Sequence, residues 1–293
     1  MDTLQRVTAP LFRIPFEHRC YETSPEDAER DYGIGPELLR QLRALGLPSI
    51  GEGALELFDG LDLSSVSLHL GLPSVRRFVL SLWPRTLRQM RAGPVAYTVT
   101  VDATCPTPQH PGKCRYLVAT GEEEGKLVIS DTPRVNVASF DIDVEETPRP
   151  VPNVLRSLVD DFSDVQFYLL PLALQSETEF MARERIATCE LFSIAVMEEA
   201  QNRGFEARLS FGVVIAAPYS QSHSWVEILV DGEWIKIDPL MARALQSTGA
   251  CTADDWPHTL SPAGLYHRLG DVGPIACHDG MACDLSLRAK VRT

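Results

Sequence analysis

The chain has 293 residues, 44% of them hydrophobic, and a formal net charge of −13 from 27 basic and 40 acidic side chains. This size and hydrophobic content allow a large buried core, so we expect folding without disulfides. The acidic balance and the scattered Lys and Arg residues argue against nucleic acid as a partner. They leave open a cationic substrate or partner.

The first residues, MDTLQRVTAPLFRIPFEHRC, contain no apolar run of signal-peptide length behind a basic head. No apolar stretch reaches the ~18 residues that a membrane-spanning helix needs. We therefore expect a cytoplasmic protein with no membrane partner. The 7 cysteines are an odd number in a chain too large to depend on disulfides, so most are expected to be free thiols.

Residues 1–92 are predicted to be mainly helical. The leucines of PELLRQLRALGLP (36–48) predict a short amphipathic helix that stops at the Gly-Leu-Pro sequence. The segment SVRRFVLSLWPRTLRQMRAG (74–93) has apolar residues at helical spacing and is interrupted or kinked by Pro84. This part of the chain contains no motif that indicates a chemistry.

From residue 95 the pattern changes to strands, predicted in VAYTVTVD (95–102), CRYLVATG (114–121) and KLVIS (126–130). The Pro-rich stretch TPRPVP (147–152) then predicts a boundary. We therefore divide the chain into an N-terminal helical and then β-hairpin region, 1–150, and a second domain, 151–293.

The second domain is predicted to begin with helices. One covers NVLRSLVDDF (153–162), and another starts near Ser176 and continues, with or without a break, through ATCELFSIAVMEEAQNRG (187–204). A strand in EARLSFGVVIAA (206–217) and a hairpin in SQSHSWVEILVDGEWIKIDP (220–239) follow. After Asp238 we expect a loop-rich segment.

The Asp-Gly pair at 231–232 predicts the register of the hairpin. A two-residue type I′ turn needs positive φ at both central positions, which Asp-Gly supplies readily. The turn places Ile228 opposite Ile235 on an apolar face. On the other face it places Glu227 opposite Lys236, a pair of opposite charge.

The same register brings a histidine to a carboxylate. Trp225 falls opposite Asp238, and His223 lies diagonally across from Asp238 on the same face. Diagonal neighbours are ~7–8 Å apart, within reach of a hydrogen bond between imidazole and carboxylate. On the hairpin alone, such a pair is more often structural than catalytic, so a third group is needed.

Cys189 is the candidate for that third group, because it lies at the predicted start of a helix with Thr188 available as N-cap. A helix N-terminus lowers the pKa of a thiol and offers N–H donors to an oxyanion. A thiolate, an imidazole and an orienting carboxylate are what nucleophilic acyl transfer requires. Taken alone, a buried structural thiol is the commoner alternative.

The three residues occur in a recognisable order. A cysteine opens a helix that ends in Gly, a strand follows, and His-x-Trp-x-Glu precedes Gly-x-Trp-x-x-x-Asp-Pro. This order resembles the core of the transglutaminase-like superfamily of cysteine enzymes, distant relatives of papain-like enzymes. The resemblance covers about residues 155–240 and is carried by TCELFSIAVMEEAQNRGFEARLSFG, HSWVEILV and GEWIKIDP.

The resemblance implies an α+β fold, in which a helix bearing the cysteine packs on an antiparallel sheet bearing the histidine and the aspartate. It implies that Cys189 is the nucleophile, His223 the general base and then acid, and Asp238 the orienting carboxylate. Residues 151–293 would form the catalytic domain, and residues 1–150 would recognise a substrate or partner.

Other positions carry over less directly. Trp225 and Trp234 would be packing residues, and Glu227 would be structural. Family members often have Gly and small residues before the cysteine, where this chain has Ile-Ala-Thr. The aromatic or amide side chain that helps to bind the oxyanion has no clear match, and the candidates are Gln166, Tyr168 and Gln175.

The resemblance implies an acyl-enzyme mechanism. We expect Cys189 to take an acyl group from an amide or a carrier-protein thioester and to pass it to an amine, which forms an amide bond in a dedicated biosynthetic pathway. The alternative is a cysteine peptidase or amidase, since both reactions share the first half and differ in what the site admits second.

Two further alternatives differ in kind. The arylamine acetyltransferase type has a similar Cys-His-Asp order, but its members carry the cysteine in the first third of the chain, unlike Cys189. The other is a non-catalytic interaction module that keeps the fold. Because Cys189, His223 and Asp238 are all intact, the sequence favours the enzyme.

Cysteine and histidine also cluster in two other segments, one between two predicted strands and one near the C-terminus. Together they could supply four zinc ligands, but neither has the Cys-x-x-Cys spacing of a zinc ribbon, so we expect no metal, only unpaired thiols and exposed histidines in loops. No Gly-rich phosphate-binding loop precedes a helix, and no cofactor is expected. The cysteine and histidine residues of the two segments are Cys105, His110, Cys114, Cys277, His278 and Cys283.

Overall fold

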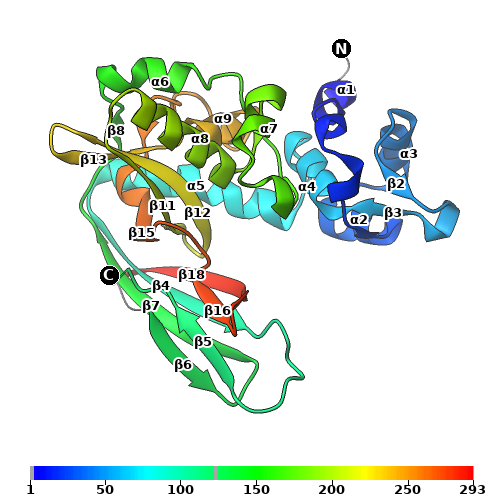
Figure 1. Cartoon of the computed structure of the whole chain (residues 1–293), viewed down its shortest axis with the longest axis horizontal. Coiled ribbons are helices and arrows are strands. Elements are labelled where there is room, and N and C mark those ends of the chain that lie inside the picture. Colours follow the sequence, from blue (N-terminus) through cyan, green and yellow to red (C-terminus); the bar gives the residue numbers. More distant parts are fainter. Residues whose placement is uncertain (1–2, 122–124, 293) are drawn as a thin grey trace. The chain divides into compact units, whose positions relative to one another are not determined.

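The computed structural model describes residues 3–121 and 125–292, which form two compact units (Figure 1). Each unit is assembled from three separate stretches, so the units do not follow the expected division at residue 150. Unit 1 consists of Met1–Ser81, Val159–Ala195 and Pro239–His258, and unit 2 of Leu82–Leu158, Val196–Asp238 and Thr259–Thr293.

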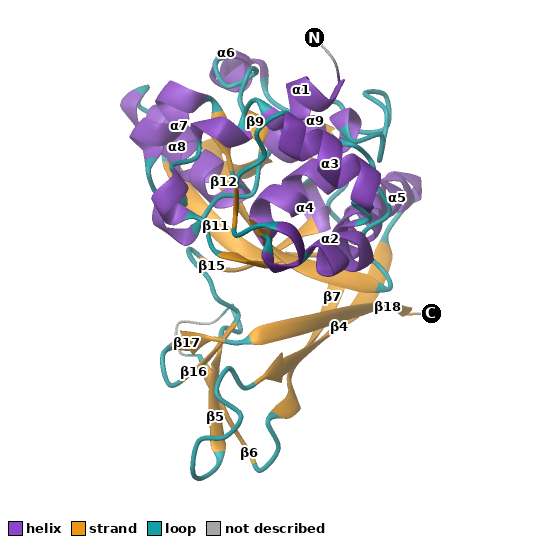
Figure 2. Cartoon of the chain, turned by 90° about the vertical axis from the view of Figure 1, so that its right-hand side faces the viewer, coloured by secondary structure: helices purple, strands orange, loops and turns teal. Residues whose placement is uncertain are grey.

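Unit 1 is mainly helical, as predicted for its first stretch. The predicted helices at 36–48 and 74–93 are confirmed, the second with Pro84 inside it. Figure 2 shows the helices in purple. The elements are α1 (Thr3–Thr8), α2 (Pro25–Tyr32), α3 (Pro36–Ala44), α4 (Gly60–His69), α7 (Thr178–Glu184) and α9 (Pro239–Ser247), with α5 (Val75–Ala92), α6 (Arg156–Asp160) and α8 (Cys189–Asn202) containing residues of both units.

Short strands complete unit 1. β1 (Tyr21–Thr23), β3 (Leu57–Asp59) and β2 (Ser49–Ile50) form an antiparallel sheet in that order. β9 (Gln166–Phe167) and β10 (Ile186–Ala187) form a parallel pair. β10 directly precedes α8. The helix expected from near Ser176 to residue 204, with or without a break, is therefore interrupted before α8.

A buried ion pair connects the segment before β1 to α4 in unit 1. Arg19 Nε donates to Asp62 Oδ2 at 2.7 Å, and both side chains are buried. The other guanidinium nitrogens donate to the carbonyl oxygens of Ile14 and Leu11, each at 2.7 Å. Desolvation nevertheless outweighs the attraction of Arg19 and raises the pKa of Asp62 to about 6, so burial of this pair is not fully compensated.

Unit 2 is built on a seven-stranded antiparallel sheet in the order β15-β11-β12-β18-β4-β7, with β13 also paired to β12. Figures 1 and 2 show β4, β7 and β18 side by side. The strands are β4 (Val95–Thr104), β7 (Arg134–Val144), β11 (Ala207–Val214), β12 (Tyr219–Val230), β13 (Glu233–Ile237), β15 (Tyr266–Gly270) and β18 (Asp284–Arg292).

Two smaller sheets belong to the same unit. The first has the order β17-β16-β5-β6, and the second pairs β14 with β8. The predicted strands at 114–121 and 126–130 are confirmed as β5 and β6. These strands are β5 (Cys114–Val118), β6 (Lys126–Ser130), β8 (Arg149–Pro150), β14 (Leu260–Ser261), β16 (Ala276–His278) and β17 (Met281–Ala282).

The expectation of a loop-rich segment after Asp238 is wrong. This segment contains α9 and five strands, including β18, which pairs with β4 over nine residue pairs and with β12. β7 was not predicted either. Both strands alternate polar and apolar residues, which is the pattern of a half-buried strand, so the sequence carried a signal for them that the prediction missed.

The predicted α+β fold class is confirmed by the helices and antiparallel sheets. Within the described part of the chain, no helix combines the length and the apolar character needed to cross a bilayer.

His69 makes the stability of unit 1 depend on pH. Its Nε2 lies 2.7 Å from the carbonyl oxygen of Phe167, and its ring stacks on Tyr168. Desolvation lowers the pKa of His69, although the Phe167 hydrogen bond acts in the opposite direction. The unfolded chain then binds more protons than the folded chain below pH ~6.5. This contribution to stability is present above that pH and is lost as the pH falls through the folded-state pKa.

We predict that His69→Gln, which keeps a side-chain donor but cannot titrate, makes the unfolding free energy less dependent on pH below about pH 6.5. The measurement is urea denaturation at a series of pH values. His18→Gln, which removes a histidine elsewhere in unit 1, is the control. An unchanged pH dependence in His69→Gln would contradict the assignment.

Candidate active site

The hairpin formed by β12 and β13 has the predicted register. Asp231 and Gly232 have φ angles of 52° and 83°, as a type I′ turn requires. Ile228 pairs with Ile235, and Glu227 lies opposite Lys236. The predicted register is therefore confirmed from the pair Val226–Ile237 to the pair Val230–Glu233.

Glu227 and Lys236 lie opposite each other in the hairpin, but each forms its ion pair with a different residue. Glu227 accepts hydrogen bonds from Arg208 and from Trp225 Nε1, the latter at 3.1 Å. Lys236 donates instead to Glu146 at 3.1 Å. Glu227 thus fixes the ring of Trp225, which agrees with the structural role expected for it.

His223 and Asp238 meet as predicted. His223 Nε2 lies 2.7 Å from Asp238 Oδ2, and the two residues are 3% and 4% exposed. A carboxylate can only accept a hydrogen bond, so Nε2 carries the proton and Nδ1 is the basic nitrogen. This orientation is the one that a general base requires.

Tyr266 makes a further contact that the sequence analysis missed. Its hydroxyl donates to Asp238 Oδ2 at 2.5 Å, the oxygen that also accepts from His223. Tyr266 opens β15, which pairs with β11, the neighbour of the histidine strand. The carboxylate is therefore fixed from two strands that are distant in the sequence.

Gly212 permits β15 to approach. It lies opposite His223 on β11, and a Cβ at this position would lie 2.0 Å from the carbonyl oxygen of His267. A glycine inside a predicted strand often marks such a close backbone approach. Gly212 was thus the signal in the sequence that a further strand packs beside His223.

Three aromatic rings surround the imidazole. Ring centroids of Trp83, Trp225 and Tyr266 lie 5.1, 6.3 and 5.0 Å from that of His223. All three side chains are at most 2% exposed. Trp83 comes from α5, in which the sequence suggested no chemistry. The histidine is thereby held in one orientation and largely shielded from water.

Cys189 is the first residue of α8, as predicted. Thr188 Oγ1 accepts a hydrogen bond from the backbone N–H of Leu191 at 3.3 Å, which confirms its N-cap role. The Tyr168 N–H donates to the Ala187 carbonyl at 3.0 Å and anchors the residues before the helix. Cys189 itself is half-buried.

A positively charged side chain of unit 1, Arg76, interacts with the Cys189 thiol. Desolvation lowers the pKa of Arg76, and a charged Cys189 acts in the opposite direction, so the two groups attract each other. Burial raises the pKa of Glu190, the next residue in the chain. Arg76 thus favours the reactive form of Cys189, and no sequence pattern indicated it.

Two of the three candidates for binding an oxyanion are already engaged. The Tyr168 hydroxyl donates to the Val7 carbonyl at 3.0 Å, and Gln175 Nε2 donates to the Leu170 carbonyl at 3.0 Å. Gln166 is exposed on β9.

The structure therefore joins His223 to Asp238 within unit 2 and places Cys189 in unit 1. The assignment of all three to one catalytic triad stays a prediction from the sequence.

One segment of the chain matches a known protein family. Residues 173–239 match the transglutaminase-like superfamily, and this stretch contains Cys189, His223 and Asp238. The chain carries a transglutaminase-like core. Tyr266 and Trp83, which contact His223, lie outside the matched stretch.

A solved structure and a sequence search complete the comparisons. One similar solved structure is the crystal structure of a protein from Cytophaga hutchinsonii that is provisionally named a cysteine protease. Its sequence is 12% identical to that of this chain. The similarity covers 68% of this chain and 87% of that one, with a TM-score of 0.34. The search of curated proteins gives no match.

A second group of reactive side chains lies outside the transglutaminase-like core. Cys105, His110, Cys114 and His278, all in unit 2, bring their possible metal-ligand atoms within 4.8 Å of one another. The expectation of exposed loop histidines is wrong for His278, which belongs to β16 and is 1% exposed.

We predict that Tyr266→Phe lowers the unfolding free energy by about 1.5–3 kcal/mol, the usual range for a hydrogen bond to a charged group. The matched control is Tyr97→Phe in the same unit, because the fully buried Tyr97 donates to a neutral oxygen of Gln89 at 3.4 Å. Tyr97→Phe should lower the unfolding free energy by less than Tyr266→Phe does. Chemical denaturation measures both, and equal losses would show that Asp238 gains nothing special from Tyr266.

We predict that Arg76→Met slows alkylation of Cys189 at pH 7 roughly 3- to 10-fold, because the thiolate loses a favourable charge. Iodoacetamide labelling, read at Cys189 by peptide mass spectrometry, measures the rate. Arg40→Met is the control, since Arg40 is an exposed cation of unit 1 that pairs with Glu37. If both variants react at the wild-type rate, Arg76 does not activate the thiol.

Proposed function

We propose that the chain is a cysteine-dependent acyltransferase that forms an amide bond between an acyl donor and an amine. The observation that carries this proposal is the buried His223–Asp238 pair at 2.7 Å, inside a transglutaminase-like core whose helix begins with Cys189. Histidine held by a carboxylate and a thiol at a helix N-terminus supply the base and the nucleophile of acyl transfer.

In the proposed first half-reaction, His223 Nδ1 takes the thiol proton and Cys189 Sγ attacks the donor carbonyl carbon. The tetrahedral intermediate collapses, the leaving amine or thiol takes the proton from His223, and an acyl thioester remains on Cys189. In the second half, His223 removes a proton from the amine acceptor as it attacks the thioester. The product amide leaves, and the thiol is restored.

The intermediate needs donors for its oxyanion. The N-terminal N–H groups of α8 are one source. Trp83 Nε1 is buried and has no hydrogen-bond partner among the described residues, although its ring lies against His223. An unsatisfied buried donor is costly, and a substrate oxygen would satisfy it.

The enclosure of His223 supports transfer over hydrolysis. With Trp83, Trp225 and Tyr266 around the imidazole, bulk water has little access to the base. An amine held by binding energy then has an advantage over water as the second substrate. The net charge of −13 favours a cationic amine in the approach to the site.

The donor that we propose is a small or peptidyl acyl group, carried as an amide or as a carrier-protein thioester in a dedicated biosynthetic pathway. The remainder of the chain, including most of residues 1–150, would serve recognition of these substrates. We propose a cytoplasmic location.

The test uses a carbonyl-directed electrophile and then candidate acyl donors. We predict that Cys189→Ala abolishes labelling at neutral pH and that His223→Ala slows it about 10²-fold or more. Cys20→Ala is the control, because Cys20 is exposed and its pKa is raised by a hydrogen bond to Glu22. Unchanged labelling in Cys189→Ala would leave a non-catalytic module as the explanation.

Intact-mass detection of an acyl group on Cys189, chased with amines or with water alone, separates transferase from hydrolase. Faster discharge with an amine supports the proposal, and fast discharge by water that no amine accelerates contradicts it. Asp238→Asn, which favours the wrong tautomer of His223, should reduce the acylation rate roughly 10³- to 10⁴-fold.

A further inference from the structure

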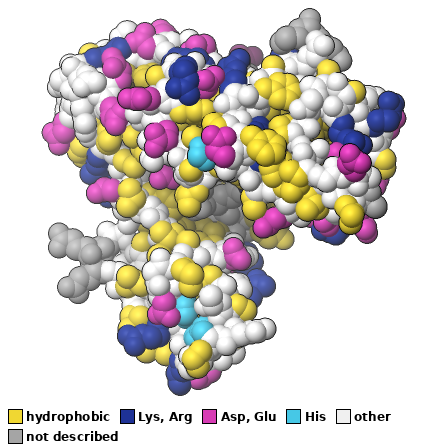
Figure 3. Space-filling view, turned by 45° about the vertical axis from the view of Figure 1, so that its right-hand side comes forward, with side chains coloured by type: hydrophobic (Ala, Val, Ile, Leu, Met, Phe, Trp, Pro, Cys, Tyr) yellow, Lys and Arg dark blue, Asp and Glu magenta, His cyan; other side chains and the backbone are white. Residues whose placement is uncertain are grey.

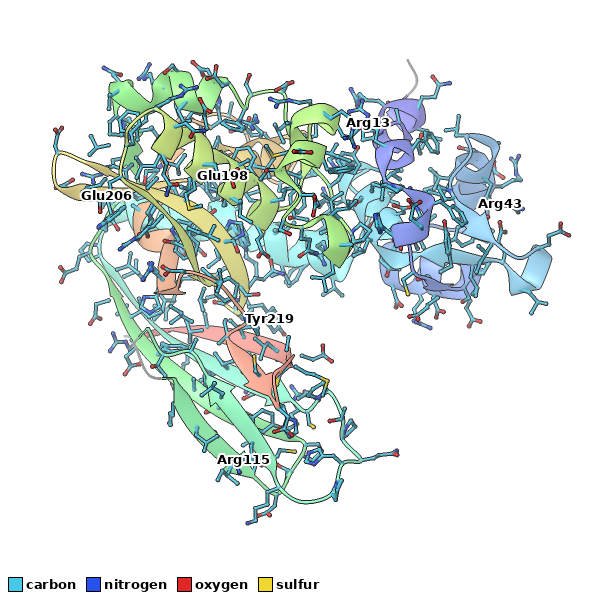
Figure 4. All side chains as sticks on the ribbon, viewed as in Figure 1. Arg13, Arg43, Arg115, Glu198, Glu206 and Tyr219 are labelled. Atoms are coloured by element: carbon cyan, nitrogen blue, oxygen red, sulfur yellow. The ribbon has the colours of Figure 1, made fainter. Side chains whose placement is uncertain are left out.

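Four possible metal ligands converge in unit 2, away from the residues of the proposed chemistry. Their ligand atoms lie within 4.8 Å of one another, and Cys105, Cys114 and His278 are buried while His110 is half-buried. In Figure 4, sulfur atoms gather near β16 and the loop after β4. Figure 3 shows histidine side chains (cyan) close together in the lower part of the view.

The fold explains why these residues meet. Cys105 directly follows β4, and Cys114 opens β5 at the other end of the loop. His278 ends β16 and pairs with Tyr116, two residues after Cys114, so His278 and Cys114 are diagonal neighbours on the buried face of the small sheet. Arg115, which alternates with them, is exposed (Figure 4).

The separation of His110 from Cys114 and the hydrogen bond of His110 suit a tetrahedral ion. His110 Nε2 lies 3.4 Å from Cys114 Sγ. Zinc bonds of ~2.3 Å to sulfur and ~2.05 Å to nitrogen give ~3.6 Å between such ligands. His110 Nδ1 lies 3.0 Å from the Pro111 carbonyl and must donate to it, so Nε2 presents its lone pair to the cluster.

A second observation points to a ligand. Both ring nitrogens of His278 are buried and have no hydrogen-bond partner among the described residues, although the residue is 1% exposed. A buried imidazole with neither nitrogen satisfied is costly. A metal bond would satisfy one nitrogen, and the carboxylate of Asp279, 3.4 Å from Nδ1, lies close enough to attract the proton of the other.

We propose that Cys105, His110, Cys114 and His278 form a structural zinc site. On binding, the two thiols each release a proton to solvent, and the two thiolates neutralise the charge of Zn²⁺, while the imidazoles bind as neutral ligands. Four protein ligands leave no open position for a substrate, which distinguishes a structural site from a catalytic one. Mixed thiolate and imidazole ligands favour zinc over magnesium or calcium.

The ion would join parts of the chain that are far apart in sequence. It would tie the long loop between β4 and β5 to the end of β16, more than 160 residues later. Cys277, the neighbour of His278, faces away from the buried side, and Cys283 is buried nearby but is not part of the convergent group. These two cysteines therefore provide matched controls.

The test measures zinc in the full-length protein, purified without added metal or chelator. Inductively coupled plasma mass spectrometry should find about one zinc per chain. Cys105→Ser, Cys114→Ser and His278→Ala should each lower the zinc content at least roughly tenfold. Cys277→Ser and Cys283→Ser should keep it at the wild-type level.

Cobalt substitution gives a readout that does not depend on the folding of a variant. After removal of zinc from the wild-type protein with a chelator, added Co²⁺ should produce the visible absorption of a tetrahedral site and a thiolate-to-cobalt charge-transfer band. Cys189→Ala should give the same spectrum and the same zinc content. Failure of the proposed acyl transfer is thereby distinguishable from failure of the zinc site.

Three outcomes would overturn the proposal. The first is a folded wild-type protein that contains no zinc and shows no tetrahedral cobalt spectrum. The second is an intact mass that is lower by two hydrogens, with peptide mass spectrometry showing that the disulfide joins Cys105 and Cys114. The third is equal loss of zinc from the ligand variants and from Cys277→Ser, which would place the ion elsewhere.

Discussion

The arrangement of the candidate active site depends on the two-residue turn at Asp231-Gly232. Its left-handed backbone fixes the register of β12 and β13, and a shift by one residue would turn His223 to the opposite face of the sheet. The contact between His223 and Asp238 is therefore a consequence of turn chemistry eight residues from the histidine. All other contacts of the carboxylate and the imidazole are added to this one geometric constraint.

The sequence revealed the parts of this site that local patterns encode. The hairpin register, the N-cap of α8 and the short helices follow from turn residues and from spacing, and the structure confirms them. Tyr266 and Trp83 could not be found in this way, because β15 and α5 reach His223 through pairing and packing that only the folded chain specifies. Gly212 was a local sign of that packing.

The remaining differences between the sequence predictions and the structure concern two strands and the metal-ligand cluster. β7 and β18 alternate polar and apolar residues, so their strand pattern was present in the sequence and was missed, whereas their pairing with β4 is visible only in the fold. The metal-binding pattern Cys-x4-His-x3-Cys was visible at 105–114, but its fourth ligand is distant, and the sequence offered Cys277, His278 and Cys283 equally. The alternation of β16 selects His278, since Cys277 points to the other face.

The interleaving of the two units has a consequence for synthesis and engineering. The chain passes from one unit to the other five times, and unit 1 receives its last stretch only at residues 239–258. A ribosome-bound fragment that contains Cys189 but ends before Pro239 therefore lacks part of both units. For the same reason no continuous segment can be exchanged with a relative as a complete module, so recombination between homologues must replace several segments together or none.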